Sequence, residues 1–220
     1  MASTPQVPYC QIRASYDDTT ITVYQAYSST IATTAVDAQK LNASPAFKPG
    51  RMTWVKPSWS WMMYRAGYSF KDPGQERILA IKMKHEHFLD VISRGVLSTH
   101  SPPGSPQSSQ AKQVTKESRE KPREVRIQWD PERSPKLEVL PYRSIQIGIP
   151  GSLSGTWANE WIESIEDVTE KARRLKATID ENPQITTEEL IGLGLIPSER
   201  AYSLPETLRK SLRMDTAPKS

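Results

Sequence analysis

The chain has 220 residues, of which 36% are apolar and 25% charged, and its 29 Lys and Arg outnumber 25 Asp and Glu for a net charge of +4. This length suits one domain with a hydrophobic core and argues against two full domains. No apolar stretch approaches the roughly 20 residues that cross a bilayer, and the N-terminus lacks the regions of a secretory signal. The single cysteine, Cys10, excludes an internal disulfide. We therefore expect a cytoplasmic or nuclear protein, and the charge favours an anionic partner such as a nucleotide or nucleic acid.

Segment 99–122 differs from the rest of the chain in composition. It is rich in Ser, Pro and Lys and has almost no aromatic or β-branched residue, so it cannot bury enough apolar surface to offset the entropy lost on ordering. Because strand-like sequence resumes after it, we expect a disordered loop inserted in a single domain. A linker between two small domains is the alternative. The expected organisation is an N-terminal tail at 1–10, one domain formed by 11–98 and 123–215, and a C-terminal tail at 216–220.

Strand and helix patterns alternate in the first half of the chain. Ile21, Val23, Gln25 and Tyr27 recur at every second residue, which predicts that they share one face of a half-buried strand. The segment at 76–83 is apolar on both faces, which indicates a central strand. The elements expected in this half are strands at 19–28, 51–55 and 76–83 and helices at 29–41, 57–67 and 85–95.

The second half predicts two strands followed by helices. Trp157, Trp161, Ile165 and Val168 are spaced by three or four residues, a pattern typical of one helix lying against a sheet. Ser203 and Glu206 have the spacing of a capping box at the start of the last helix. The elements expected here are strands at 125–129 and 143–149 and helices at 155–179, 186–197 and 203–212. Together the two halves predict an α+β fold.

Residues 51–70 form the most unusual block, because three tryptophans and two tyrosines are interleaved with Arg51, Lys56 and Arg65. Aromatic rings beside cations suit stacking on a base or a nicotinamide ring while a charge holds phosphate. Lys56 and Arg65 lie within apolar sequence, where burying a charge requires a partner. The alternative assigns the apolar side chains of this block to the core, namely Trp54, Trp59, Met62 and Met63.

Polar side chains also cluster in three other blocks. The Asp130-Pro131 dipeptide makes a rigid corner at a strand end, where pockets are commonly lined, although a charged turn is the alternative. Gln146 lies between two isoleucines in mid-strand, which indicates either a buried, satisfied amide or a ligand contact. The candidates in these blocks are Arg13, Tyr24, Gln25, Tyr27, Gln128, Trp129, Asp130, Glu132, Arg133, Arg143, Ser144 and Gln146.

Several common functional signatures are absent from the sequence. It contains no GxGxxG, Walker A, GxSxG or paired CxxC motif. His85 and His87 lie two residues apart, a spacing that does not place both on one helix face, and no third ligand lies nearby. We interpret them as the start of a surface helix and expect no metal.

Five motifs resemble the family known as domain of unknown function 4291: IRASYDDTTITVYQAYS, RMTWVKPSWSWMMYRAGY, KDPGQERILAIKM, IQWDPER and YRSIQIGIPG. The match runs from about Gln11 to the C-terminus and skips 99–122. The family occurs in bacteria and fungi, and the Ser/Pro-rich insertion favours a fungal member.

The order strand, helix, strand is similar to that of the ADP-ribosyltransferase superfamily, in which a split sheet grips NAD. The resemblance implies a mixed, largely antiparallel split β-sheet with flanking helices. It also implies that Gln25 on the first strand binds NAD, that Thr53 and Tyr64 contribute from the second strand and its helix, and that Gln146 positions the nicotinamide ribose. The sequence departs from the superfamily in two places, since the late strand lacks its customary glutamate and Gln25 replaces Arg or His.

Two functions follow as hypotheses. The first is transfer of ADP-ribose from NAD to nucleic acid or a small acceptor, in which Gln75, Glu76 or Glu132 could steer the nucleophile. The second is a non-catalytic module that binds RNA or DNA. The first predicts that Gln25 and Gln146 face one cavity from neighbouring strands. Side chains on opposite faces of the sheet would contradict the first hypothesis and make the second the leading one. The site expected comprises catalytic Gln146, Tyr64 and Glu132, and cofactor-binding Arg13, Tyr24, Gln25, Tyr27, Thr53, Trp54, Lys56 and Arg65.

Overall fold

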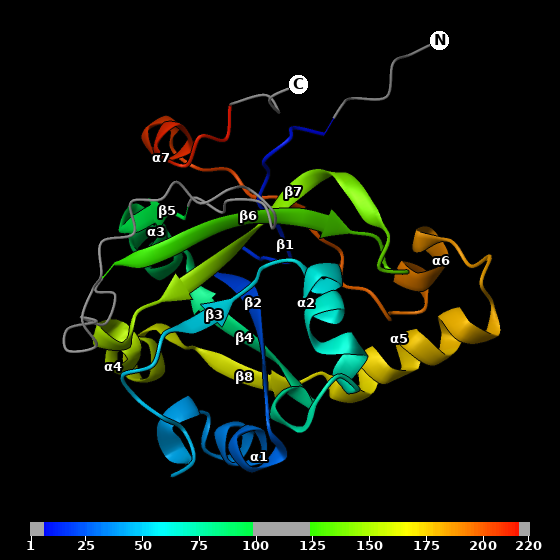
Figure 1. The fold of residues 1–220 in the computed structure, drawn as a ribbon, viewed down its shortest axis with the longest axis horizontal. Helices are drawn as coiled ribbons and strands as arrows, with labels where there is room; N and C mark the ends of the chain where they lie inside the picture. Colours follow the sequence, from blue (N-terminus) through cyan, green and yellow to red (C-terminus); the bar gives the residue numbers. More distant parts are fainter. Residues whose placement is uncertain (1–6, 99–123, 216–220) are drawn as a thin grey trace, which may run out of the picture.

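The computed structural model describes residues 7–98 and 124–215, and it confirms an α+β fold (Figure 1). The expected loop at 99–122 lies outside the described residues, as do 1–6 and 216–220 of the expected tails. Among the helices of the described part, none is both long and apolar enough to span a membrane.

A three-stranded antiparallel sheet has β4 at its centre, as the apolar character of both its faces predicted. Alternate side chains of each strand point to the same face, so Val23 and its partner Ile81 enter one core while Tyr24 points to the other side. The strands, in sheet order, are β2 (Thr20–Tyr27), β4 (Arg77–Lys84) and β8 (Ser164–Asp167).

A four-stranded sheet contains the remaining long strands, and its pairs are antiparallel except for β5 with β6. Because β5 precedes 99–123 and β6 follows it, both halves of the chain contribute to one sheet. The strands, in sheet order, are β3 (Thr53–Val55), β7 (Val139–Ile149), β6 (Val125–Arg133) and β5 (Gly95–Leu97). A separate short pair joins β1 (Arg13–Ala14) to β9 (Arg200–Ala201).

Helices lie around the two sheets (Figure 1). α1 (Ser29–Ala38) and α3 (His85–Ser93) pack their apolar sides into the larger core, whereas α2 (Trp59–Ala66) and α5 (Thr169–Glu181) pack into the smaller one. α2 begins after Ser58, whose Oγ accepts the Trp61 N–H at 3.1 Å, and ends at Gly67 with a left-handed φ of 56°. The short helices are α4 (Ser154–Thr156), α6 (Thr187–Gly192) and α7 (Glu206–Ser211).

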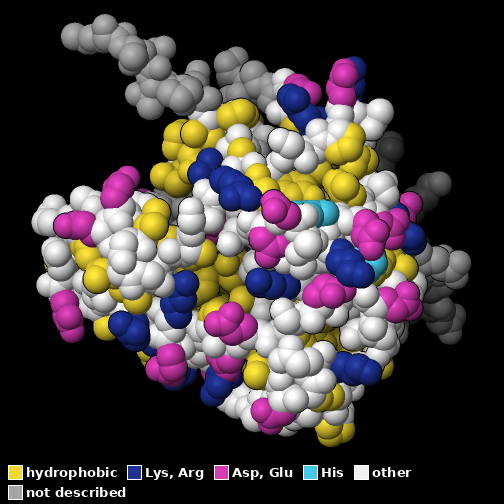
Figure 2. All heavy atoms as spheres, turned by 180° about the vertical axis from the view of Figure 1, so that it is seen from behind, with side chains coloured by type: hydrophobic (Ala, Val, Ile, Leu, Met, Phe, Trp, Pro, Cys, Tyr) yellow, Lys and Arg dark blue, Asp and Glu magenta, His cyan; other side chains and the backbone are white. Residues whose placement is uncertain are grey.

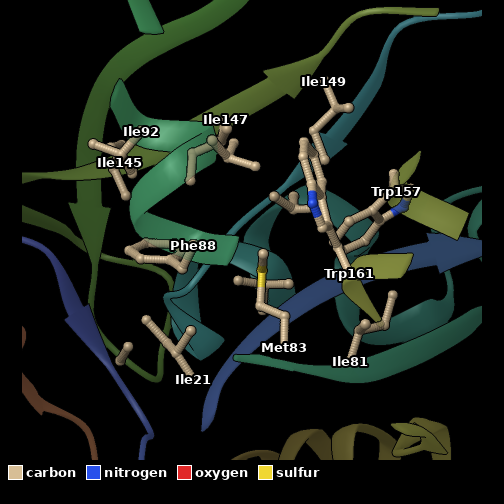
Figure 3. Close-up of a cluster of buried hydrophobic side chains, with 14 of the residues drawn as sticks. Ile21, Ile81, Met83, Phe88, Ile92, Ile145, Ile147, Ile149, Trp157 and Trp161 are labelled. Atoms are coloured by element: carbon tan, nitrogen blue, oxygen red, sulfur yellow. The ribbon is translucent and has the colours of Figure 1, made fainter. Parts of the chain in front are cut away.

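The larger core lies between the two sheets, where Phe88, Trp157 and several isoleucines are fully buried (Figure 3). Each such side chain stabilises the fold by about 1.5–3 kcal/mol relative to exposure. The smaller core contains Trp59, Met62 and Met63, so the core alternative is confirmed for these three residues.

The prediction of one continuous helix at 155–179 is wrong for its central residues. Ser164–Asp167 is instead strand β8, which pairs with β4 and places Ile165 opposite Ile81. Trp157 and Trp161 lie in a short π-helical turn before it, and α5 begins only at Thr169. The four apolar side chains at 157, 161, 165 and 168 are all buried in this arrangement, so their spacing fits it as well as it fits a helix. The pairing of β8 with the edge of β4 could not be read from the spacing, because β4 is distant in sequence.

The capping box expected at Ser203 and Glu206 is also wrong, since Pro205 occupies the cap position of α7 without a side-chain hydrogen bond. A capping box forms instead at α6, where Thr186 Oγ1 accepts the Glu189 N–H at 3.2 Å and Glu189 accepts the Thr186 N–H at 2.8 Å.

Gly151→Ala should destabilise the protein by about 2 kcal/mol or more. A Cβ at Gly151 would lie 2.2 Å from the Gly50 carbonyl oxygen, and backbone cannot give way as a flexible side chain can. Gly155→Ala is the matched control, since nothing lies within 4 Å of its Cβ position. Chemical denaturation measures both, and equal stabilities would show that the chain around Gly50 can move aside.

Candidate ligand-binding site

The two sheets meet where β2 approaches β3. Tyr24 and Lys56 form an isolated antiparallel bridge, in which the Tyr24 N–H donates to the Lys56 carbonyl at 2.7 Å and the Lys56 N–H donates back at 3.2 Å. Beyond this bridge the two strands belong to separate sheets. The result is a split between β2 and β3 on the side of the bridge where Ala26 and Thr53 lie.

A cavity of about 380 Å³ occupies this split, a volume within the usual range for small-molecule sites. Trp54 forms part of its wall and lies close over Gly148, its partner on β7, so that a Cβ there would fall 2.9 Å from the indole. Seven of the expected site residues line this cavity, namely Gln25, Tyr27, Thr53, Trp54, Lys56, Arg65 and Gln146.

Gln25 is fully engaged by the protein itself. Its Nε2 donates to Thr53 Oγ1 at 2.6 Å and to the Trp54 carbonyl at 3.1 Å, while its Oε1 accepts the Tyr27 hydroxyl at 3.0 Å. The amide therefore joins the two strands at the split in place of the missing backbone pairing. Both ends of the side chain are satisfied, as a buried amide requires.

Gln146 lines the same cavity but points the other way. Its neighbours Ile145 and Ile147 enter the larger core, so alternation turns Gln146 to the opposite face, whereas Gln25 shares its face with core residue Val23. The two glutamines thus lie on opposite faces, and β3 separates their strands. Gln25 and Gln146 were expected on neighbouring strands, and this was wrong. Strand β3, residues 53–55, lies between β2 and β7.

Three cations converge on the cavity: Arg51, Lys56 and Arg65. Within the described residues, no hydrogen bond or ion pair joins any of their side-chain charges to another residue. Lys56 is only 4% exposed, and burial, reinforced by the nearby Arg65 charge and opposed by Asp130, lowers its pKa to about 7. No carboxylate is among the lining residues, so the walls are cationic and amide-rich.

Asp130 is an acidic group that interacts with the charge of Lys56, and two amides hold its carboxylate. Gln128 Nε2 donates to its Oδ1 at 2.8 Å and Gln146 Nε2 donates to its Oδ2 at 3.1 Å. Gln128 and Gln146 are direct partners in the β6–β7 ladder, which explains why both reach the same carboxylate. Gln146 Oε1 accepts no hydrogen bond from another residue of the described part of the chain, and Gln146 lines the cavity.

A second cavity of about 340 Å³ adjoins the first, with Tyr27, Arg51, Met52 and Thr53 in both linings. Its other walls include the apolar Phe47. A ligand with two lobes could therefore place its centre beside Arg51 and its ends in the two cavities.

The remaining expected site residues lie elsewhere. Tyr24 is buried in the smaller core against Trp59, with ring centroids 5.3 Å apart. Tyr64 is 41% exposed and stacks with the Arg133 guanidinium at 3.8 Å. Arg13 and Glu132 line a separate cavity of about 350 Å³ beside the start of α2.

Glu199 also lines this separate cavity, and no sequence signal pointed to it. Its Oε1 accepts the Trp59 N–H at 2.6 Å, at the positive end of α2. Burial and the nearby Glu132 charge raise its pKa to about 8. Glu132 is itself buried, which raises its pKa, and its Oε1 accepts the Ser58 hydroxyl at 2.9 Å.

Other candidate groups have structural partners. Glu76 Oε1 accepts the Ser29 N–H at the start of α1, at 2.9 Å. His85 contacts the Tyr202 hydroxyl at 3.0 Å and the Asp17 carbonyl at 2.9 Å. Burial raises the pKa of the Cys10 thiol to about 11. Across 7–98 and 124–215, no group of three or more His, Cys, Asp or Glu is arranged to hold a metal ion.

The fold and the site define an α+β protein whose split sheet surrounds a cationic cavity. A model of the family described as "Domain of unknown function (DUF4291)" matches residues 11–202, so the chain belongs to that family. No curated protein matches the sequence.

Proposed function

We propose that the chain binds a phosphate-bearing nucleotide in the cavity between β2 and β3. The observation that carries this proposal is the convergence of Arg51, Arg65 and the partly protonated Lys56, whose side chains have no ion-pair partner among the described residues. Charges brought together in this way repel one another, and an anion relieves that repulsion. Phosphate groups are the natural partners of arginine because its planar donors match their oxygens.

The remaining walls suit the rest of a nucleotide. Thr53, Gln146 and Gln75 offer hydroxyl and amide groups for sugar and base, and Trp54 offers a ring. The adjoining cavity extends the site beyond Arg51, which favours a dinucleotide over a mononucleotide.

The same observations give less support to a nucleic-acid module, although the opposite faces of Gln25 and Gln146 had been expected to favour it. Stacking on an extended strand needs exposed aromatic rings, yet Trp59 and Trp61 are 1% and 7% exposed. Figure 2 shows acidic and basic side chains interspersed on the face that it views, without a continuous basic stripe.

ADP-ribosyl transfer from NAD is a second candidate function. The split sheet favours it, whereas the opposite faces of Gln25 and Gln146 count against it. In this reaction the bond from nicotinamide to ribose breaks through an oxocarbenium-like state, which needs orientation and charge stabilisation. Gln146 Oε1 and the Asp130 carboxylate behind it would face the ribose. Since Gln25 is occupied by Thr53, Trp54 and Tyr27, we assign it to shaping the wall instead of binding NAD.

Arg65→Met should weaken nucleotide binding by at least about tenfold, or 1.4 kcal/mol, while preserving the fold. Arg65 lies in the last turn of α2, three residues after Met62, so both side chains reach the cavity. Calorimetry with NAD, ADP-ribose and ADP measures the loss, and raising the salt concentration should weaken wild-type binding. Arg174→Met is the matched control because Arg174 is exposed on α5. Equal nucleotide affinities for Arg65→Met and Arg174→Met would show that Arg65 does not contact the nucleotide.

Gln146→Ala tests the transferase candidate. If Gln146 orients the ribose, the variant should release nicotinamide at least about a hundredfold more slowly while retaining most NAD affinity. Nicotinamide release and calorimetry separate rate from affinity. Wild-type protein that binds NAD but releases no nicotinamide with any acceptor would exclude transfer and leave nucleotide binding in place.

A further inference from the structure

Lys56 occupies an uncommon position for a lysine. Its side chain is 4% exposed yet lines the split-sheet cavity, and within the described residues its ammonium group has no hydrogen bond or salt bridge. The Trp61 ring lies 5.0 Å from Nζ. The backbone bridge to Tyr24 and the following Pro57 fix the start of the side chain, so its amine is held at the cavity wall.

The groups around Lys56 favour its neutral form. Burial penalises a positive charge at Nζ most strongly, Arg65 on α2 repels one and Asp130 on β6 attracts one, so that the pKa of Lys56 falls to about 7. An ordinary exposed lysine is neutral in roughly one molecule in two thousand at pH 7. Desolvation and a neighbouring cation are the two features that convert a lysine into a nucleophile.

We propose that Lys56 is a nucleophilic amine that forms an imine with aldehydes or ketones carrying an anionic group. Nζ attacks the carbonyl carbon, the carbon–nitrogen double bond forms, and the carbonyl oxygen leaves as water with the two protons of the amine. Arg65 and Arg51, which line the same cavity, would hold the carboxylate or phosphate of the carbonyl compound. No oxidant or reductant is required.

This inference goes beyond nucleotide binding and does not depend on it. A nucleotide could occupy the cavity over an amine that never reacts, and the amine could react in a protein that binds no nucleotide. Labelling of Lys56 and nucleotide affinity therefore give separate answers.

The test uses two small aldehydes of similar size, glyoxylate, which carries a carboxylate, and acetaldehyde, which does not. Each is added to the full chain at pH 7 with cyanoborohydride, which reduces an imine to a stable adduct, and peptide mass spectrometry gives the labelling rate at each lysine. Lys56 should react with glyoxylate at least about tenfold faster than the exposed Lys40, because only an unprotonated amine attacks a carbonyl and the pKa of Lys56 is lowered to about 7. ADP should slow the reaction at Lys56 and leave Lys40 unchanged.

The outcomes separate the two proposals. Labelling at Lys56 no faster than at Lys40 with either aldehyde overturns the imine inference, even if calorimetry shows nucleotide binding. Fast labelling with glyoxylate and slow labelling with acetaldehyde would support both parts of the proposal, the nucleophilic amine at Lys56 and the binding of the anionic group by Arg51 and Arg65. Equally fast labelling with both aldehydes would support a nucleophilic amine at Lys56. It would contradict the assignment of Arg51 and Arg65 to binding the anionic group of the carbonyl compound. Lys56→Arg keeps the positive charge and should abolish the adduct without unfolding the protein.

Discussion

Lys56→Met should make the protein more stable while weakening its ligand binding by at least about tenfold. Burial lowers the pKa of Lys56 to about 7, so protonating it in the folded state is costly. Allowing for relaxation, we expect Met to gain about 3 kcal/mol near pH 6, or a melting temperature higher by roughly 6–12 °C. Greater stability with lost binding is typical of a residue retained for function.

The pH dependence of this gain has a definite sign. Between pH 7 and the ordinary lysine value of 10.5, the unfolded chain holds a proton at Lys56 that the folded chain lacks, so wild-type stability rises with pH through this window. The advantage of Lys56→Met should therefore be largest below pH 7 and disappear near pH 10.5. Lys40→Met, at an exposed position, is the control for this measurement. A Met variant less stable than wild type at pH 6 would indicate that Lys56 holds a structural partner.

Glu199→Gln should show the opposite dependence. The pKa of Glu199 is raised from 4.5 to about 8, so between these values the folded chain holds a proton that the unfolded chain has released, and the stability due to this group falls as pH rises. Gln keeps the oxygen that accepts the Trp59 N–H and removes the repulsion by Glu132. Because Glu199 is only partly buried, we expect a gain of about 2 kcal/mol at pH 9 that vanishes near pH 4.5.

Denaturation at several pH values measures this gain, with Glu188→Gln on the exposed side of α6 as the control. A Glu199 variant that loses stability at pH 9 would mean that the carboxylate is stabilised, by Arg13 and the start of α2, more than burial destabilises it.

The local architecture of the site could be predicted from sequence. The alternation of Val23 and Gln25 along β2, and the cap of α2 by Ser58 and Gly67, depend on side-chain period and turn chemistry, which act over a few residues. Arg51, Lys56 and Arg65 line the cavity and lie within 15 residues of one another in the sequence. Their closeness in space could therefore be expected from their closeness in the chain.

The members of the site that come from distant segments could not be predicted in the same way. Glu199 reaches the start of α2 across 140 residues, and the sequence offered no period or motif to mark it. Arg13 and Glu132 carried suitable charges but belong to the separate cavity beside Glu199.

What the sequence by itself determined about this protein is its α+β class, its family, most of its strands and helices, and the grouping of cations and aromatics at 51–70. The tertiary structure decided which edge each strand pairs with, and thereby placed β8 beside β4 and β3 between β2 and β7. It turned Gln25 and Gln146 to opposite faces and left Lys56 buried at the split. The reason is physical: periodicity fixes the face of a residue within its own element, whereas hydrogen bonding between distant strand edges fixes which faces meet.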